Sequence, residues 1–280
     1  NKWRFNIMIK KKVFQDIPRY QINEDEVHFA QHEGRVIFRD PITKIVTFEK
    51  WNKVILPGSF YTLQKHWPGI KLPVKLPNYN EELDLDNSVA LTPEEKLNEI
   101  VVLFAMGTDG CGPEGSQIYD VDYTKWIDKD HLVPFRYCIS DNDLNDELRG
   151  QYFGRKELKE LDRVSYFFKA FDAEPVVKCI YMDGTPVDEN VYTSENKQKV
   201  RTYVELAMSV NKYDFRDYYE ATTGINNCEV NTISLLTAYP KTIDGYTVYQ
   251  DIQPLTKLNF SNESLRDLTK GIDITYQIYY

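Results

Sequence analysis

A series of short β-strand patterns fills the sequence from Val164 onward. Each pattern is rich in β-branched and aromatic residues, and turn-forming residues separate it from the next, which favours strands over helices. Residues 165–171 and 176–181 flank Asp172-Ala173-Glu174-Pro175, a spacing that predicts a hairpin. Further strands are predicted at residues 200–210, 230–238, 247–252 and 272–280. Closely spaced strands of this kind are typical of a β-sandwich.

The last of these patterns, residues 272–280, is apolar on one face. Ile272, Ile274, Tyr276 and Ile278 recur with a spacing of two, so they lie on the same side of an extended strand. Such an apolar strand is expected to be tied into a sheet, either within its own chain or in a neighbouring subunit.

Two helices are predicted before the strand-rich part. Thr92, Pro93 and Glu95 form a capping box with proline in the first turn, which predicts a helix start. An apolar stripe then extends this predicted helix over residues 92–106, and Gly107 ends it. Residues 143–152 carry apolar side chains at four-residue intervals, which indicates a second, shorter helix.

The first part of the chain is irregular. Residues 3–9 alternate loosely like a strand, and residues 36–38 and 44–48 read as two short strands around a turn. Prolines at positions 57, 68, 73 and 77 predict an extended arm without helix over residues 56–77. We therefore expect a β-rich α+β fold: an N-terminal arm, small sheet and capped helix over residues 1–110, and a β-sandwich-like domain over residues 111–280.

Composition limits the class of protein. The 280 residues include 34 basic and 43 acidic side chains, and the net charge of −9 argues against binding DNA by neutralising phosphates. This negative charge is compatible with a position close to DNA in an acidic channel, without specific binding. The sequence has no uninterrupted apolar run of the roughly 18 residues that a spanning helix needs, and no secretory signal is evident at its start, so no membrane span is expected.

Several residue groups suggest chemistry but match no binding signature. His28 and His32 have helical spacing for a metal, yet no third ligand is evident nearby. The acidic runs that begin at Asp84 and Asp141 resemble the start of a calcium loop, but both lack the glycine that such a loop requires. We expect no metal and no cofactor.

Cysteine and glycine patterns are equally weak as signs of catalysis. The four cysteines, with no C-x-x-C pair among them, predict reduced, buried thiols. Cys111 with His131 is the one pairing that could form a nucleophile and base, while the glycine loop at residues 107–115 lacks the pattern of a phosphate cradle. A structural role is favoured for both, and no enzyme activity is predicted.

The 20 tyrosines admit two interpretations. Tyrosine-rich strands supply large packing area at subunit interfaces, or exposed rings stack on sugars in a receptor-binding module. Interface packing is favoured, and exposed tyrosines gathered around one groove would reverse that preference.

A set of turn and packing motifs covers roughly the last 175 residues. The motifs lie at residues 107–115, 132–137, 152–155, 166–172, 181–185, 223–226, 231–236 and 271–274. With them the sequence resembles a family of virion proteins of tailed bacteriophages, in particular of crAss-like and related AT-rich phages. The resemblance implies a structural part of the neck, tail or baseplate and carries over no catalytic residues.

From these observations we expect a structural component of a tailed-phage virion that forms a ring or collar layer. Its partners would be other virion proteins and copies of itself, and it would be made in the bacterial cytoplasm and reside in the virion. Arg136, Arg155, Tyr276 and Ile278 are the predicted subunit contacts, although an intramolecular ion pair is an equal alternative for the arginines. A receptor- or glycan-binding tail module is the second interpretation, and a tail-associated hydrolase the third.

Overall fold

The computed structural model describes residues 33–112, 117–181, 184–187, 200–264 and 271–280. All described residues belong to one compact unit, His32–Tyr280. The predictions for residues 3–9 and for His28 and His32 lie outside the described residues.

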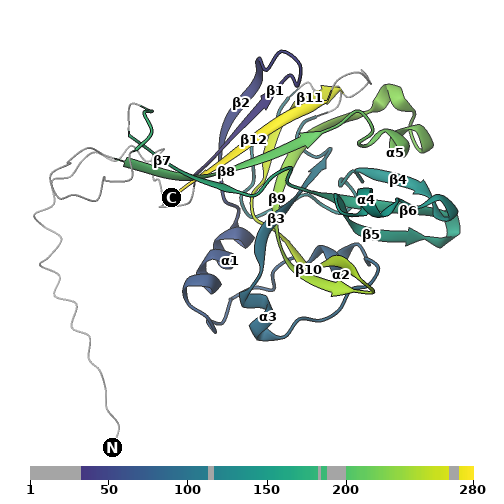
Figure 1. Ribbon diagram of the computed structural model, residues 1–280, viewed down its shortest axis with the longest axis horizontal. Helices are drawn as coiled ribbons and strands as arrows, with labels where there is room; N and C mark the ends of the chain where they lie inside the picture. Colours follow the sequence, from purple (N-terminus) through teal and green to yellow (C-terminus); the bar gives the residue numbers. More distant parts are fainter. Residues whose placement is uncertain (1–32, 113–116, 182–183, 188–199, 265–270) are drawn as a thin grey trace, which may run out of the picture. The chain divides into compact units, whose positions relative to one another are not determined.

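Twelve strands in the described part of the chain form two antiparallel sheets (Figure 1). The five-stranded sheet has the order β2 (Val46–Lys53), β1 (Glu33–Arg39), β12 (Ile272–Tyr279), β8 (Val200–Val210) and β7 (Val176–Tyr181). The seven-stranded sheet has the order β10 (Tyr246–Pro254), β9 (Glu229–Ile243), β3 (Ile100–Gly107), β6 (Arg163–Ala170) and β4 (Arg136–Ile139), with β11 (Leu258–Ser264) on β9 and β5 (Tyr152–Leu158) on β6.

Short helices connect these strands. They are α1 (Leu56–His66), α2 (Tyr79–Glu82), α3 (Pro93–Leu97), α4 (Asp146–Arg149) and α5 (Arg216–Ala221), with 3₁₀ turns at Ser140–Asn142, Lys159–Leu161 and Ile225–Asn227. None of the described helices is long and apolar enough to cross a membrane.

The main core lies between the two sheets. Phe38 of β1 and Phe260 of β11 meet edge to face with ring centroids 5.0 Å apart, and both rings are fully buried. A second core covers the other face of the seven-stranded sheet, where Tyr79 of α2 packs on Phe168 of β6. The β-rich α+β fold with two packed sheets, predicted from the sequence, is confirmed.

Strand β3 corrects the helix predicted over residues 92–106. The capping box at Thr92 is present, but α3 ends at Leu97 and the chain continues as a strand from Ile100. Leu103 and Phe104 point to opposite faces of the central strand and are both fully buried, one in each core. A strand covered on both faces is apolar at every position, and this pattern imitates a buried helix.

Two further helix predictions need correction. Residues 56–77 contain α1, because Pro57 sits in the first turn, where its missing N–H is not needed, and Pro68 follows the helix end. The helix predicted over residues 143–152 is confined to α4, and Tyr152 already begins β5.

The hairpin predicted between residues 165–171 and 176–181 does not form. Strand β6 belongs to the seven-stranded sheet, whereas β7 pairs with β8 in the five-stranded sheet. The turn residues 172–175 therefore carry the chain from one sheet to the other.

The elements on either side of residue 110 share both sheets. Strands β1 and β2 form the predicted pair around a turn, and β1 then pairs with β12 of the C-terminal part. Strand β3 lies between β6 and β9. Each of the two sheets therefore contains strands from residues 1–110 and from residues 111–280.

Candidate functional site

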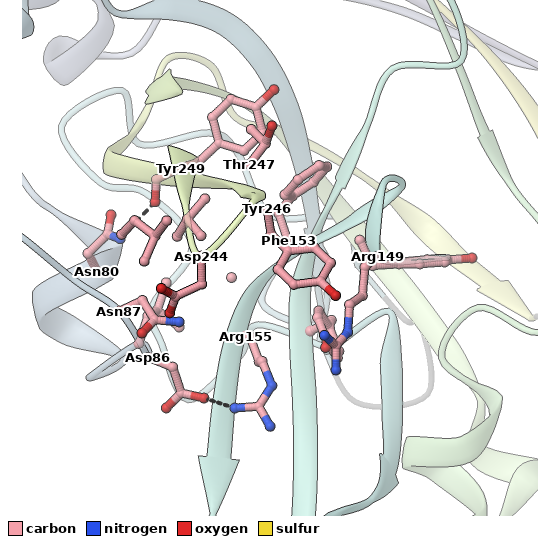
Figure 2. A pocket seen from close by; sticks show the side chains of 16 residues that line it. Asn80, Asp86, Asn87, Arg149, Phe153, Arg155, Asp244, Tyr246, Thr247 and Tyr249 are labelled. Atoms are coloured by element: carbon pink, nitrogen blue, oxygen red, sulfur yellow. Dashed lines mark hydrogen bonds and ion pairs between the residues drawn. The ribbon is translucent and has the colours of Figure 1, made fainter. Parts of the chain in front are cut away.

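A pocket of about 290 Å³ lies beside the turn that joins β9 to β10. Most of the lining residues come from three segments, residues 85–87, 149–155 and 243–249, and Asn80 and Tyr166 complete the lining. Figure 2 shows Asp86, Asn87 and Asp244 along one side and Phe153 and Arg149 on the opposite side. This volume is at the lower end of the range of small-molecule sites.

The hairpin that forms one wall is set by a two-residue turn. Asp244 and Gly245 both have positive φ, 51° and 84°, as a tight hairpin turn between twisted strands requires. Tyr246 follows directly, exposes 43% of its surface and donates a hydrogen bond to Asp146 Oδ1 at 3.1 Å. The turn therefore places a carboxylate and an aromatic ring at the pocket.

Arg155 fixes another part of the pocket wall through two carboxylates. Its guanidinium donates to Asp143 from Nε at 3.1 Å and from Nη2 at 3.0 Å, and its Nη1 pairs with Asp86. Asp86 also accepts the backbone N–H of Glu157 at 3.3 Å. Arg155 thus ties the loop before α3 to strand β5.

Asp143 is the anionic centre of this cluster. Burial acts to raise the pKa of its carboxyl, but hydrogen bonds from Tyr166, the backbone of Leu144 and Arg155 outweigh burial, so the pKa lies below its ordinary value. Burial and the hydrogen bond to Asp143 raise the pKa of Tyr166. Asp143 therefore stays ionised at neutral pH and keeps Arg155 in place.

The guanidinium group of Arg149 has partners for only some of its hydrogen-bond donors. Its Nη2 lies 3.2 Å from Asp143 Oδ2, and its guanidinium carbon lies 5.3 Å from the centre of the Tyr246 ring. Its Nε is buried and has no hydrogen-bond partner among the described residues. A buried donor without a partner is uncommon in folded proteins.

The predicted contact residues are placed as follows. Arg136 lies 3.2 Å from Asp217 and 5.5 Å from the centre of the Tyr152 ring, and Arg155 lines the pocket. Tyr276 is fully buried and Ile278 is 4% exposed, both in the middle strand of the five-stranded sheet.

These placements bear on the predicted subunit contacts. Each arginine has its ion pair inside the chain, and β12 is tied into its own sheet between β1 and β8. In this fold the side chains of Tyr276 and Ile278 have almost no surface left for another subunit.

The two acidic runs that resemble calcium loops serve Arg155 instead, through Asp86 and Asp143. Within the described residues no group of three His, Cys, Asp or Glu side chains is arranged to hold a metal ion.

Cys111 is held by amide side chains. Its Sγ donates to Asn262 at 2.7 Å and accepts from Asn231 at 3.2 Å, and burial raises the pKa of the thiol. His131 is not among its hydrogen-bond partners; the carbonyl of His131 accepts the N–H of Thr108. A thiol with a raised pKa is a poor nucleophile at neutral pH.

The glycine loop packs closely on β9. A side chain at Gly110 would place its Cβ 2.0 Å from the carbonyl oxygen of Asn231. The Gly110 N–H already donates to Asn231 Oδ1 at 2.6 Å, so it is not available to a phosphate. Residues 113–116 of this loop lie outside the described residues.

A buried pair of carboxyls, Glu99 and Asp251, was not foreseen. Both are about 5% exposed, and they line a small cavity of about 180 Å³ with Lys96, Asn78 and Gln253. Burial, followed by the hydrogen bond and charge of Asp251, raises the pKa of Glu99 to about 9. Asp251 accepts from Asn78 at 2.6 Å and lies 3.1 Å from Lys96. The two carboxyls are 152 positions apart in sequence, so no local signal identifies them.

No protein-family model, curated protein or solved structure matches the chain.

Proposed function

We propose that the chain is a structural subunit of a tailed-phage virion, where copies of it form a ring or collar layer and pack against other virion proteins. In this role it is made in the bacterial cytoplasm, ends in the particle and carries out no catalysis. The observation that carries the proposal is an apolar hairpin tip beside an open sheet edge.

The tip of the β1–β2 hairpin carries three apolar side chains in solvent. Ile42, Ile45 and Val46 are 72%, 65% and 47% exposed. Asp40 orders this turn, since its Oδ1 accepts the N–H of Ile42 at 3.0 Å and that of Thr43 at 2.7 Å. An exposed apolar group on a hydrogen-bonded turn supports a contact with another chain.

Strand β2 is also an open edge. Among the described strands its one neighbour is β1, and its burial pattern is mostly exposed or partly exposed. An edge strand presents unpaired backbone groups that a strand of a second chain can extend. The hairpin tip and the edge together form one continuous candidate interface.

The outer face of the same sheet adds aromatic and arginine side chains. Trp51 of β2 and Tyr203 of β8 both stack on Tyr279 of β12, at centroid distances of 5.1 and 5.0 Å. Arg35 lies 5.8 Å from the centre of the Trp51 ring, and Trp51 is 45% exposed. Aromatic residues and arginine are enriched at subunit interfaces.

The other two interpretations receive less support. Of the four tyrosines that line the pocket only Tyr246 is exposed, so the pocket is not a groove of exposed tyrosines that would accommodate a long glycan. Glu99 is hydrogen-bonded directly to Asp251, whereas the two carboxyls of a glycosidase stand roughly 5 to 9.5 Å apart. A hydrolase is therefore not favoured.

The test is the mass of the purified full chain in solution, measured by light scattering during size-exclusion chromatography. We expect a discrete oligomer in the wild type, and a shift toward monomer when Ile42→Asp and Ile45→Asp are combined. Leu161→Asp is the matched control, because Leu161 is 63% exposed but lies in a 3₁₀ turn away from the hairpin tip. A monomeric wild type, or an oligomer that the tip variant leaves intact, would contradict the proposed interface.

A further inference from the structure

The charges around the pocket beside β9–β10 nearly cancel. Arg149 and Arg155 are offset by Asp86 and Asp143, with which they are paired. Asp244 adds one more carboxylate, which Figure 2 shows on the same side of the pocket as Asp86. An anionic ligand would meet guanidinium groups that already have partners as well as a free carboxylate, so the pocket does not suit anions.

Several hydrogen-bonding groups at the pocket have no partner within the described residues. They are the carboxylate of Asp244, the side-chain amide of Asn87, the hydroxyl of Thr247 and the buried Nε of Arg149. Three of these four groups can donate a hydrogen bond, and three can accept one. A ligand that only donates, such as an ammonium group, would leave the side-chain N–H groups of Asn87 without an acceptor.

The remaining surface of the pocket is apolar. Phe153 and Tyr249 meet edge to face with ring centroids 4.7 Å apart, and Leu85 and Val248 also line the wall. Tyr246 adds a ring that is 43% exposed. A ligand for this pocket therefore has both hydroxyl groups and C–H faces.

We propose that this pocket binds one neutral pyranose unit of a carbohydrate, with Asp244, Asn87 and Thr247 at its hydroxyls and Phe153 and Tyr246 against its C–H faces. A pyranose ring carries hydroxyls that both donate and accept, which matches the acceptor of Asp244 and the donor and acceptor groups of Asn87 and Thr247. The volume of about 290 Å³ is enough for one such unit and not for a long chain. Binding does not depend on the proposed assembly role, because all the lining residues come from one chain.

The experiment uses the purified full chain and free sugars. Glucose, galactose, mannose, N-acetylglucosamine and N-acetylgalactosamine are tested by saturation-transfer NMR and calorimetry up to about 10 mM, which detects a dissociation constant of ~1 mM. Glucuronic acid and glucosamine are the charged counterparts. At least one neutral sugar is expected to bind more tightly than both charged sugars.

Two pocket variants and two controls assign the binding to this pocket. Asp244→Asn keeps a residue that tolerates positive φ but removes the charge, and Tyr246→Ala removes the exposed ring; each is expected to weaken binding at least tenfold. Asp120→Ala and Tyr213→Ala alter an exposed carboxylate and a tyrosine that is 53% exposed, both outside the pocket, and are expected to leave binding unchanged.

The outcomes separate the alternatives. Absence of binding by every neutral sugar would overturn the proposal, as would tighter binding of a charged sugar or binding that survives both pocket variants. An oligomer without sugar binding would refute this inference alone, and a sugar-binding monomer would refute the proposed assembly alone.

Discussion

Replacing Glu99 by glutamine is expected to stabilise the protein at neutral and alkaline pH. Glu99 is 5% exposed and its pKa is about 9, so the folded chain keeps it protonated at pH 7, with Asp251 as its hydrogen-bond partner. In the unfolded chain the same carboxyl ionises near its ordinary pKa of 4.5. Folding therefore takes up a proton at neutral pH, and the carboxyl opposes folding increasingly as the pH rises.

The size of the effect follows from these two pKa values. Each pH unit above the unfolded value costs ~1.4 kcal/mol of folding free energy, which amounts to about 3 kcal/mol at pH 7. The cost is absent below pH 4.5, grows between pH 4.5 and 9, and stays constant above pH 9. Glutamine has no such titration, and its amide N–H can donate to Asp251 as the protonated carboxyl does.

The assay is urea unfolding, followed by fluorescence, at several values between pH 5 and pH 9. Glu99→Gln is expected to show a higher unfolding midpoint than wild type at pH 8 and a smaller loss of stability as the pH rises. Glu174→Gln, at an exposed position between β6 and β7, is the control and is expected to follow wild type. A variant that is less stable than wild type at pH 8, or that loses stability with pH as steeply as wild type, would refute the reasoning.

Three further predictions concern other buried groups. The fully buried Asp214 lies 2.8 Å from the Lys169 ammonium, and Lys169→Met removes this cation; the variant should be destabilised by about 3–5 kcal/mol in urea unfolding. Combining Lys169→Met with Asp214→Leu should cost less stability than Lys169→Met alone. An equal or greater cost would argue against the buried charge as the cause. Gly154→Ala should cost ~1–3 kcal/mol, because Gly154 has φ +70° and the added Cβ would lie 2.4 Å from the Phe168 ring; an unchanged midpoint would contradict this packing. Cys228 is 1% exposed, and burial raises the pKa of its thiol to about 12. Peptide mapping after treatment with a thiol reagent should therefore find Cys228 modified only in the unfolded protein. Rapid labelling of Cys228 in the native state would count against its burial.

Local signals in the sequence predict some elements well. The capping box at Thr92 and Glu95 is present, because it depends only on residues three positions apart. The end of that helix cannot be located from the local sequence. Strand β3 is buried on both faces, so its residues are apolar throughout and continue the apolar pattern of the helix. Whether residues 100–106 form a helix or a strand is decided by β9 and β6 on either side, and no local pattern reports them.

Which strands pair is decided by the tertiary fold. Residues 172–175 have the composition of a hairpin turn, yet the strands before and after them belong to different sheets. Lys169 of β6 donates to the carbonyl of Ser209 in β8 at 2.8 Å and so joins the two sheets through a buried side chain. A turn sequence indicates a change of direction but does not identify the strand that follows as its partner.

The candidate pocket is assembled from segments that are distant in the sequence, so its composition is not evident there. One of its signals is local: Asp244-Gly245 between two strand patterns is a strong indicator of a tight hairpin. Arg155 was singled out for its side-chain type, but its partners Asp86 and Asp143 are 69 and 12 positions away. Only the fold brings the hairpin and the ion cluster to the same cavity.

The proposal that the chain is a structural part of a phage particle can be decided by quantitative mass spectrometry of purified virions from cells in which the chain is produced during phage growth. We expect peptides of this chain in the particle, at a constant copy number relative to the portal protein and resistant to high-salt washing. Absence of the chain from purified particles, or its removal by washing while the particles stay intact, would overturn the proposal.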